Sequence, residues 1–334
     1  MSEALMRAGW YEKVGPAAEV LQVSPMPRPE PGMGEVRVRI AFSGVNPSDV
    51  KARGGWRGPQ MPFPRVVPHS DGSGVIDKVG AQVPAARVGE RVWLFNAAWR
   101  RPFGTCAEYA VVPMQQAVTL PEGVPLDAAA CLGIPALTAH RSVFCEGPVT
   151  GKVVLVAGGA GVVGFYAIQL AKWGGASLVV ATVSSADKAA VARQAGADLV
   201  LNYRTDDVAT RVREATGGQG VDHVVEVDLG ANLALDLELL RHNGAIASYA
   251  SMGRPAPELP FYAMNYRNLV LRTVLVYSLP PDVLRQGITD ITRWLAGGQA
   301  RHQIAGRYPL AQLAQAHLAG EDPARIGQVV VDCQ

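Results

Sequence analysis

The segment Lys152–Trp173 reads KVVLVAGGAGVVGFYAIQLAKW, and it decides the fold of the chain. An apolar run suited to a strand comes first, a glycine-rich turn follows, and an apolar segment of helical length ends it. The turn at 159–164 fits GxGxxG, whose glycines permit a tight turn, close approach of backbone N–H groups to a pyrophosphate, and close helix–strand packing. We therefore predict a dinucleotide site rather than an ordinary turn, with the phosphates at the positive end of the helix. Its residues are Gly159, Ala160, Gly161, Val162, Val163 and Gly164.

The length and composition describe a globular chain of two domains. Its 334 residues exceed the usual size of one domain, and 49% of them are hydrophobic. A net charge of +2 gives no reason to expect a nucleic-acid partner, and no apolar run reaches the roughly 18 residues that span a membrane. The cysteines form no CxxC pair, which argues against a disulfide framework or a zinc ribbon and favours a reduced, cytoplasmic location. They are Cys106, Cys131, Cys145 and Cys333.

The pattern of strands and helices changes near residue 126. Before it, short alternating runs among many prolines and glycines predict a β-rich domain, with strands at 35–42, 74–79, 91–95 and 108–112. After it, strand-like and helical runs alternate, as in a doubly wound parallel α/β sheet. We expect residues 1–125 and 266–334 to form the first domain and 126–265 the dinucleotide-binding domain. The second domain should hold strands at 153–157, 178–182, 199–201, 223–227 and 245–249, and helices near 162–173, 186–195, 206–215 and 231–241.

The second strand of this domain indicates which dinucleotide is bound. Sites for NAD usually end this strand in a carboxylate, about 20 residues beyond the glycines, that holds the ribose 2′-hydroxyl. Here the strand ends in ATVSSADK at 181–188, and no carboxylate stands at its end. Ser184 and Lys188 instead suit a 2′-phosphate, so we predict NADPH. In the alternative interpretation Ser184 or Ser185 caps the next helix and Lys188 is a solvated charge, and both can hold together.

Further motifs along the chain are SGVNP at 43–47, GIPALTA at 133–139, GAD at 196–198, NYR at 202–204 and GQVV at 327–330. Together with the glycine turn they resemble the medium-chain dehydrogenase/reductase superfamily, and within it the zinc-free quinone oxidoreductases of the zeta-crystallin type. The likeness runs nearly from end to end of the chain. It implies a GroES-like β-rich catalytic domain, an inserted Rossmann domain that binds NADPH, and reduction of a quinone or an α,β-unsaturated carbonyl.

The resemblance also implies roles for individual residues. Asn46 and Thr138 match positions near the nicotinamide. From the residues alone, Asn46 reads as a turn residue before Pro47, and Thr138 as a helix hydroxyl bonded to its own backbone. Lys51 stands where the family often has tyrosine, and its ammonium can donate to a developing oxyanion. The expected catalytic residues are Asn46, Lys51 and Thr138, and the further cofactor contacts implied by the resemblance are Ser184, Lys188, Tyr203 and Arg325.

The positions of the zinc ligands in related dehydrogenases predict that this chain holds no catalytic metal. Zinc-dependent relatives carry a cysteine and a histidine where this chain has Gly44 and Ser70, and a four-cysteine lobe where it has Cys106. Catalytic zinc needs about three protein ligands, and the sequence does not supply them. We interpret His69, beside Asp71, as a turn histidine near the rim of the active site rather than as a ligand.

Two other functions remain open. One is reduction of an enoyl thioester or substituted acrylate, which needs a cationic site for the carboxylate or phosphate of its substrate. The other is an NADPH-binding, crystallin-like protein with little turnover. The cationic candidates for the first are Lys51, Arg53, Arg57, Arg100 and Arg101.

The last part of the chain bears on its assembly. A long apolar strand at 268–277 would invite uncontrolled pairing if its edge were exposed, and the family resemblance implies a homodimer across it. The alternative is that the tail covers this edge within one chain. That tail, from about residue 280, should rejoin the first domain with helices at 282–296 and 310–319 and a strand at 328–332.

Overall fold

The computed structural model describes residues 4–56 and 58–334, and the chain divides into two compact units. Unit 1 contains the residues up to Ile134 together with His302–Gln334, and unit 2 is Pro135–Arg301. No helix of the described residues is long and apolar enough to cross a membrane. The four cysteines are buried and carry free thiols.

A seven-stranded sheet forms the frame of unit 1, in the order β14-β15-β3-β4-β5-β7, with β6 also paired to β3. Its long strand β3 buries Val36, Val38 and Ile40, as alternation along a strand predicts. The β-rich domain is thereby confirmed. The strands are β1 (Leu5–Trp10) and β2 (Gln22–Pro27), which pair with each other, and β3 (Glu35–Val45), β4 (Asp71–Val79), β5 (Arg91–Leu94), β6 (Tyr109–Pro113), β7 (Ala117–Thr119), β14 (Ile304–Pro309) and β15 (Gln328–Asp332). The helices are α1 (Ala17–Val20), α2 (Pro47–Arg53), α3 (Leu126–Ala129) and α11 (Leu313–Glu321), with short 3-10 turns η1 (Ala85–Arg87), η2 (Met114–Gln116) and η4 (Leu310–Gln312).

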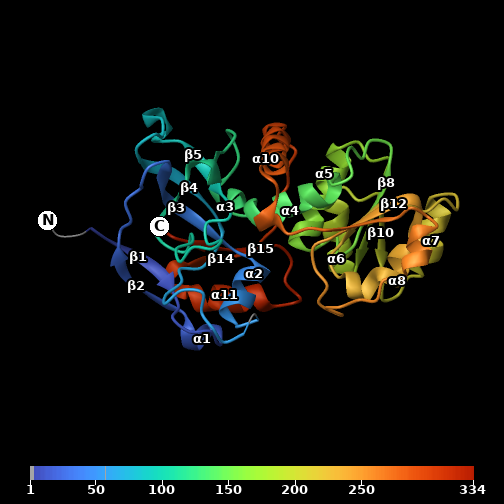
Figure 1. The fold of residues 1–334 in the computed structure, drawn as a ribbon, viewed down its shortest axis with the longest axis horizontal. Helices are drawn as coiled ribbons and strands as arrows, with labels where there is room; N and C mark the ends of the chain where they lie inside the picture. Colours follow the sequence, from blue (N-terminus) through green and yellow to red (C-terminus); the bar gives the residue numbers. More distant parts are fainter. Residues whose placement is uncertain (1–3, 57) are drawn as a thin grey trace. The chain divides into compact units, whose positions relative to one another are not determined.

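Unit 2 is built on a six-stranded parallel sheet in the order β10-β9-β8-β11-β12-β13. Numbered within the unit this is 3-2-1-4-5-6, the strand order of the Rossmann fold, so the predicted doubly wound sheet is confirmed. Helices cover both faces, with α5 packed beside α6 and α7 beside α8 (Figure 1). The strands are β8 (Val153–Val156), β9 (Leu178–Val183), β10 (Leu199–Asn202), β11 (Val221–Glu226), β12 (Leu240–Ser248) and β13 (Val270–Thr273). The helices are α4 (Gly133–Phe144), α5 (Val162–Trp173), α6 (Ala186–Gln194), α7 (Val208–Ala215), α8 (Leu229–Leu239), α9 (Phe261–Asn265) and α10 (Pro281–Ala296), with the 3-10 turn η3 (Val276–Ser278).

The observed division of the chain differs from the predicted one at both boundaries. Residues 266–301 belong to unit 2, because β13 pairs with β12 and the end of this segment is bonded to α5. There the Gln169 side chain accepts from Arg301 N at 2.8 Å and donates to Arg301 O at 3.1 Å. Residues 126–134 belong to unit 1, where Ile134 N donates to the Asp71 carboxylate at 2.8 Å. The tail therefore rejoins the first domain at 302 rather than near 280.

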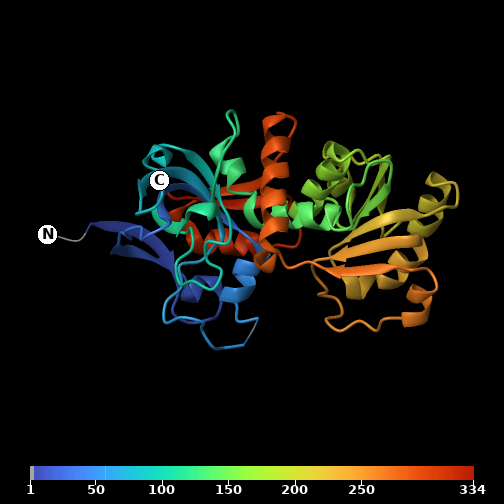
Figure 2. The same cartoon turned by 45° about the horizontal axis from the view of Figure 1, so that its top comes forward.

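The strand expected at 268–277 is shorter in the structure. It pairs with β12 from Val270 to Thr273, and the last bond runs from Val274 N to Ser248 O at 2.8 Å. Because β12 ends at Ser248, the chain beyond it has no neighbouring strand and turns into η3. Figure 2 shows β13 at the outer edge of the sheet of unit 2.

Two buried histidines join α11 to the sheet of unit 1. The Nε2 atoms of His69 and His317 lie 3.0 Å apart, and the two rings are stacked. His69 Nδ1 also lies 2.8 Å from Ser43 Oγ. One imidazole must donate and the other accept, so both are neutral. Burial lowers the pKa of His69 well below its ordinary value and lowers that of His317 to about 3.

This pair makes the stability of the protein sensitive to acid. The unfolded chain protonates His317 near its ordinary pKa of 6.5, whereas the folded chain does so near 3. Stability that is present above pH 6.5 is therefore lost as the pH falls toward 3. We expect the free energy of unfolding to fall by about 2 kcal/mol more in the wild type than in His317→Phe between pH 7 and pH 5, because phenylalanine keeps a ring but takes no proton.

Urea titrations of both proteins at the two pH values measure this difference. Burial raises the pKa of Asp49 to about 7 and that of Asp71 well above its usual range, so these carboxyls act in the opposite sense. They are present in both proteins, and the comparison removes their contribution. Equal losses of stability in the two proteins would contradict the assignment.

Candidate active site

The glycine turn between β8 and α5 forms a backbone cradle. Gly158 has a φ of +66°, which favours glycine, and Gly159 N donates to Thr182 O at 3.0 Å. A Cβ atom on Gly164 would overlap the carbonyl oxygen of Gly158, so helix α5 can begin this close to the strand only with glycine there. The helix starts at Val162 with Gly161 as its N-cap, and no side chain caps it. Its first N–H groups have no partner within the helix, which suits them to an anion.

The position of this cradle in the sheet matches that of a dinucleotide site. The order of the strands reverses between β8 and β11, and ligands of open α/β sheets bind outside the carboxyl ends of the strands at such a point. The turn follows the carboxyl end of β8 directly. Its glycines and uncapped amides therefore fit the pyrophosphate of a dinucleotide.

Three predicted cofactor residues gather at the carboxyl ends of β9 and β10. Ser185 is the N-cap of α6 and accepts from Lys188 N at 3.3 Å, so the capping serine is Ser185 and not Ser184. Ser184 lies between the end of β9 and this cap. Tyr203 follows β10, donates from its backbone N to Val183 O at 3.0 Å, and leaves 54% of its surface exposed. A hydroxyl, an ammonium and an aromatic ring thus lie around one end of the sheet.

Arg204 is a further cation at this edge, which belongs to the NYR motif at 202–204 but had no predicted role. It is exposed, and its backbone N donates to Asn202 Oδ1 at 3.1 Å just beyond β10. Asp187, whose charge would repel a phosphate, is exposed in the first turn of α6. Because Arg204 follows Tyr203 in the sequence, its position beside the carboxyl end of β10 could have been predicted.

Asn46 is buried in a polar network of unit 1. It stands before α2, and its backbone N donates to Asp49 Oδ2 at 2.8 Å. Its Nδ2 donates to Asp71 Oδ2 at 2.7 Å, and its Oδ1 accepts from Gln328 Nε2 at 3.1 Å. Asn46 is the N-cap residue of α2, directly before Pro47. Its place at the nicotinamide stays a prediction.

Asp71 is the centre of that network, and sequence reasoning missed it. It is fully buried at the start of β4, and its carboxylate accepts from Ile134 N as well as from Asn46. Burial raises the pKa of this carboxyl well above its usual range. Because a Cβ atom on Gly133 would overlap the Asp71 carboxylate, these two residues together fix where α4 begins. Asp71 thus positions Asn46 and the start of α4. A carboxylate among glycines at the start of an apolar strand is the sequence feature that could have indicated this role.

Lys51 and Thr138 lie on helices of different units. Lys51 is a partly exposed residue of α2 in unit 1, and its ammonium lies 5.9 Å from the centre of the Trp56 ring. Trp56 is 64% exposed, so this contact is at the surface of the unit. Thr138 is a buried residue of α4 in unit 2. The roles of both stay predictions.

Arg325 lies in unit 1, just before β15. Its guanidinium donates to the Gly327 carbonyl, and its Nε has no acceptor among the described residues. Burial lowers the pKa of this guanidinium. An arginine with a buried N–H group that lacks an acceptor is suited to an anionic ligand. The contact of Arg325 with the cofactor stays a prediction.

The positions of the zinc ligands in related dehydrogenases are occupied by close packing. A Cβ atom on Gly44 would overlap the Ala130 carbonyl, so no side chain fits there. Ser70 and His69 are buried, and His69 is engaged with Ser43 and His317 rather than lying on a rim. Among the described residues, no group of three His, Cys, Asp or Glu side chains could hold a metal ion.

Two family models match the chain, one in each part. An alcohol dehydrogenase GroES-like domain matches residues 32–122, and a zinc-binding dehydrogenase model matches residues 162–293. A quinone oxidoreductase from Lama guanicoe is 30% identical, covering 94% of this chain and 93% of its own. A mycobacterial protein complexed with NADPH is 30% identical, with a TM-score of 0.83 over 98% of this chain and 99% of its own. An NAD-dependent alcohol dehydrogenase is 31% identical, with a TM-score of 0.87 over the same shares, 98% and 99%.

These likenesses extend over both units and over nearly the whole chain. They agree with the strand order of unit 2, the glycine turn and the GroES-like sheet of unit 1. The predicted resemblance is thus confirmed: the chain is an oxidoreductase that belongs to the quinone oxidoreductase family of the medium-chain dehydrogenase/reductase superfamily.

Proposed function

We propose that this enzyme uses NADPH to reduce a quinone or an α,β-unsaturated carbonyl compound, and that it does so without zinc. The observation that carries the proposal is the uncapped glycine turn at the switch point of the sheet, which is followed by a β9 end without a carboxylate. Relatives named quinone oxidoreductase support the acceptor class, and the neighbour complexed with NADPH supports the cofactor.

Different residues of this chain bind different parts of the cofactor. The amides of the turn at 159–164 hold the pyrophosphate at the helix N-terminus. Ser184 and Lys188 bind the 2′-phosphate, and Tyr203 lies against the adenosine. Asn46 and Thr138 border the nicotinamide, and Arg325 supplies a further cation.

NADPH supplies the hydride, and the protein must stabilise the negative charge that develops on the acceptor oxygen. Lys51 is the side chain we assign to that task, because its ammonium is a charged donor at the surface of α2. Gly44 and Ser70 stand where zinc ligands would be needed, so a protein donor takes the place of a Lewis acid.

Most of the cationic side chains that an enoyl or acrylate reductase would need for its anionic substrate already contact other side chains of this protein. Arg53 is buried in an ion pair with Glu321, and Arg101 donates to Gln116 Oε1 at 2.5 Å. The Arg100 guanidinium lies over the Trp99 ring, 5.4 Å from its centre, and Arg57 lies outside the described residues. We therefore favour a neutral acceptor over an anionic one.

An acceptor panel tests the proposed function. Chelator-washed protein should oxidise NADPH steadily with 9,10-phenanthrenequinone or an enone, and added zinc should not raise the rate. Binding of NADPH without turnover of any acceptor would favour the crystallin-like alternative. Turnover restricted to carboxylated acceptors, with a KM that rises with salt, would favour the acrylate alternative.

The Lys188 side chain should set the preference for NADPH. Lys188→Ala should weaken NADPH by about 1–3 kcal/mol, the range for a hydrogen bond to a charged group, and should leave NADH nearly unchanged. Lys172→Ala is a matched control, because that lysine pairs with Asp198 on the far side of the βα unit. Titration calorimetry with both cofactors measures the effect, and equal weakening of NADPH and NADH would refute the assignment.

The role of Lys51 can be separated by kinetics. If its ammonium stabilises the oxyanion, Lys51→Met should lower kcat and kcat/KM together by about 10²-fold, as for removal of a transition-state donor. Trp56→Leu should leave a smaller defect, because the ammonium remains. A raised KM with an unchanged kcat would assign Lys51 to substrate recognition instead, and no change at all would place it outside the reaction.

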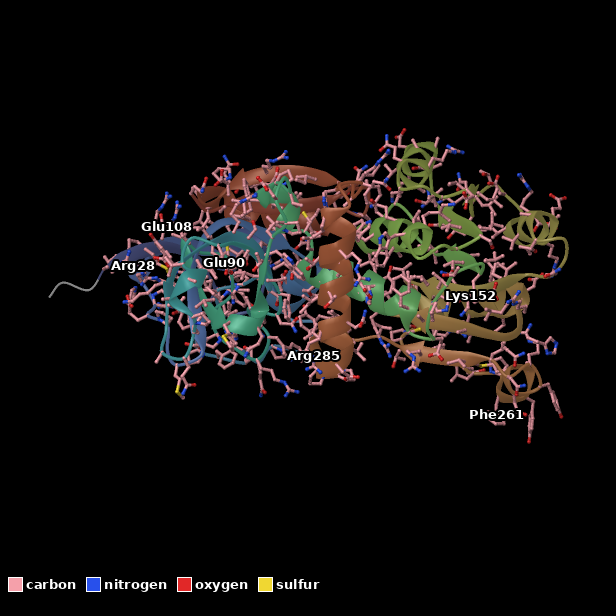
Figure 3. All side chains as sticks on the ribbon, turned by 90° about the horizontal axis from the view of Figure 1, so that it is seen from above. Arg28, Glu90, Glu108, Lys152, Phe261 and Arg285 are labelled. Atoms are coloured by element: carbon pink, nitrogen blue, oxygen red, sulfur yellow. The ribbon has the colours of Figure 1, made fainter. Side chains whose placement is uncertain are left out.

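We also propose that two chains form a homodimer across β13. This strand is at the edge of the sheet and pairs with β12 on one side. Beside it, α9 carries a surface cluster of aromatic rings in which Phe261 is 66% and Tyr262 is 69% exposed, and Phe261 projects from unit 2 in Figure 3. An exposed strand edge and an apolar patch together suit a two-fold contact with a second copy.

Val270→Glu should disrupt this contact, because it puts a charge on the exposed face of β13. Light scattering at micromolar concentration should give twice the chain mass for the wild type and one chain mass for the variant. Leu5→Glu, at an equally apolar exposed site of unit 1, is the control and should remain dimeric. A monomeric wild-type protein would contradict the proposal.

A further inference from the structure

Unit 2 contains a second cavity at the end of its sheet opposite the glycine turn. The cavity has a volume of about 670 Å³ and is lined by α4, α10 and the turns that precede β8 and β9. Pro148 comes before the start of β8, and Gly174 comes before the start of β9. The glycine turn follows the carboxyl end of β8, so the length of the strands separates the two sites.

The packing of α10 on α4 creates this cavity. A Cβ atom on Gly287 would lie 3.3 Å from His140 Nδ1 and from Leu137 Cδ2, so the two helices approach closely at that glycine. One turn further along α4 is the larger side chain of Phe144, whose ring lies 4.9 Å from that of His140, centre to centre. The helices cannot stay in contact past that ring, and the space beside it is the cavity.

A carboxylate with neutral partners lies within the cavity. Asp290 Oδ2 lies 3.0 Å from His140 Nε2 and accepts from Gln286 Nε2 at 2.9 Å. Burial lowers the pKa of His140, so this imidazole is a neutral donor, as is the Gln286 amide. The side chain of Asp290 is 14% exposed, and the nearest cation among the described residues is the exposed guanidinium of Arg293, 3.8 Å from Oδ1. This ion pair is long and its guanidinium is exposed to solvent, so it screens the charge of Asp290 only weakly.

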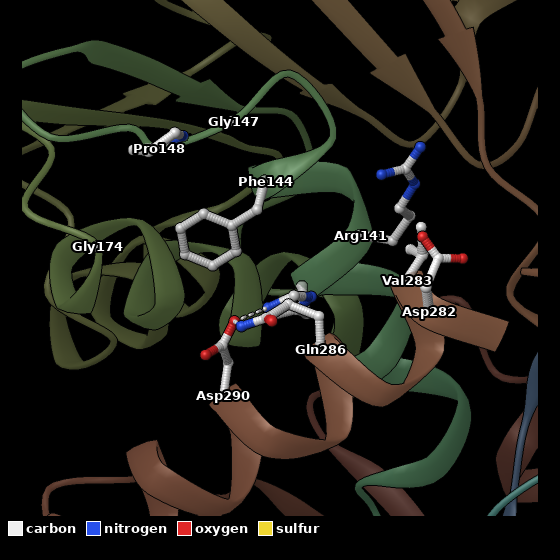
Figure 4. Close-up of a pocket in the computed structure, with 10 residues that line it drawn as sticks. Arg141, Phe144, Gly147, Pro148, Gly174, Asp282, Val283, Gln286 and Asp290 are labelled. Atoms are coloured by element: carbon white, nitrogen blue, oxygen red, sulfur yellow. Dashed lines mark hydrogen bonds and ion pairs between the residues drawn. The ribbon is translucent and has the colours of Figure 1, made fainter. Parts of the chain in front are cut away.

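Figure 4 shows how these groups are arranged. The Phe144 ring and the Asp290 carboxylate lie on the same side of the cavity, with Gln286 beside Asp290. Arg141 and Asp282 lie on the opposite side, and their charges are of opposite sign. A ligand between Phe144 and Asp290 would meet an aromatic face and an anion, which is the pattern that recognises a ring bearing a positively charged group.

We propose that this cavity binds a small aromatic amine, whose ring packs against Phe144 and whose ammonium group donates to the Asp290 carboxylate. The site is independent of NADPH, because none of its residues belongs to the glycine turn or to the carboxyl ends of β9 and β10. Val283, on the first turn of α10, lines the cavity on the side opposite Phe144.

Calorimetric titration with 2-phenylethylamine tests the proposal on the protein saturated with NADPH. Its neutral and anionic counterparts, 2-phenylethanol and 3-phenylpropionate, serve as matched probes. We expect the amine to bind with a dissociation constant of about 1 mM or tighter, the alcohol more weakly, and the acid not measurably. Absence of amine binding to the NADPH-saturated protein, or binding of the acid as tight as that of the amine, would overturn the proposal.

Two variants examine the site by different routes. Asp290→Asn should weaken the amine by about tenfold or more, since it removes a charged acceptor, whereas Glu214→Gln, at an exposed carboxylate of α7, should not. Val283→Phe should weaken binding of both the amine and the alcohol, because the larger ring takes up space in the cavity, whereas the same change at the exposed Val88 of unit 1 should not. If Asp290→Asn fails to fold, Val283→Phe still tests whether the amine binds in this cavity. An unchanged affinity of the Val283→Phe protein for the amine would refute the proposed site.

Discussion

A Cβ atom on Gly164 would collide with the carbonyl oxygen of Gly158, and this steric limit sets the geometry at the centre of unit 2. Because Gly164 has no side chain, α5 begins at the end of β8 and directs its first amides toward the carboxyl edge of the sheet. A Cβ on Gly159 would in the same way lie 2.8 Å from the Ala181 Cβ, so the turn also fixes the distance to β9. The uncapped amides of the turn and the end of β9 are thus both positioned by the close packing of these glycines.

The architecture of unit 2 could be predicted because its signals are local. The first four strands, β8 to β11, are short runs rich in apolar residues, a helix follows each of them within a few residues, and the glycines mark the first crossover. The assignment of residues 266–301 could not be predicted in this way. It depends on the pairing of β13 with β12 and on the bonds between Gln169 and Arg301, which lie far apart in the sequence.

The same distinction between local signals and distant contacts applies to the residues of the candidate site. Ser184 and Lys188 could be found because they closely follow the end of a predicted strand, where parallel sheets bind ligands, whereas Tyr203 was implied by the family resemblance. Asp71 could not, because its role depends on Asn46 and Ile134, which reach it from other parts of the chain. The His69–His317 pair and the Asp290 cavity were missed for the same reason, since each joins side chains more than 100 residues apart.

If the close approach of Gly164 to Gly158 builds the NADPH site, a Gly164→Ala variant should bind NADPH more weakly than the wild type. Calorimetry should show at least about a tenfold loss relative to the wild type, because the added methyl group forces the helix away from the strand. Circular dichroism should confirm that the variant is folded. A folded Gly164→Ala protein that binds NADPH as tightly as the wild type would contradict the account.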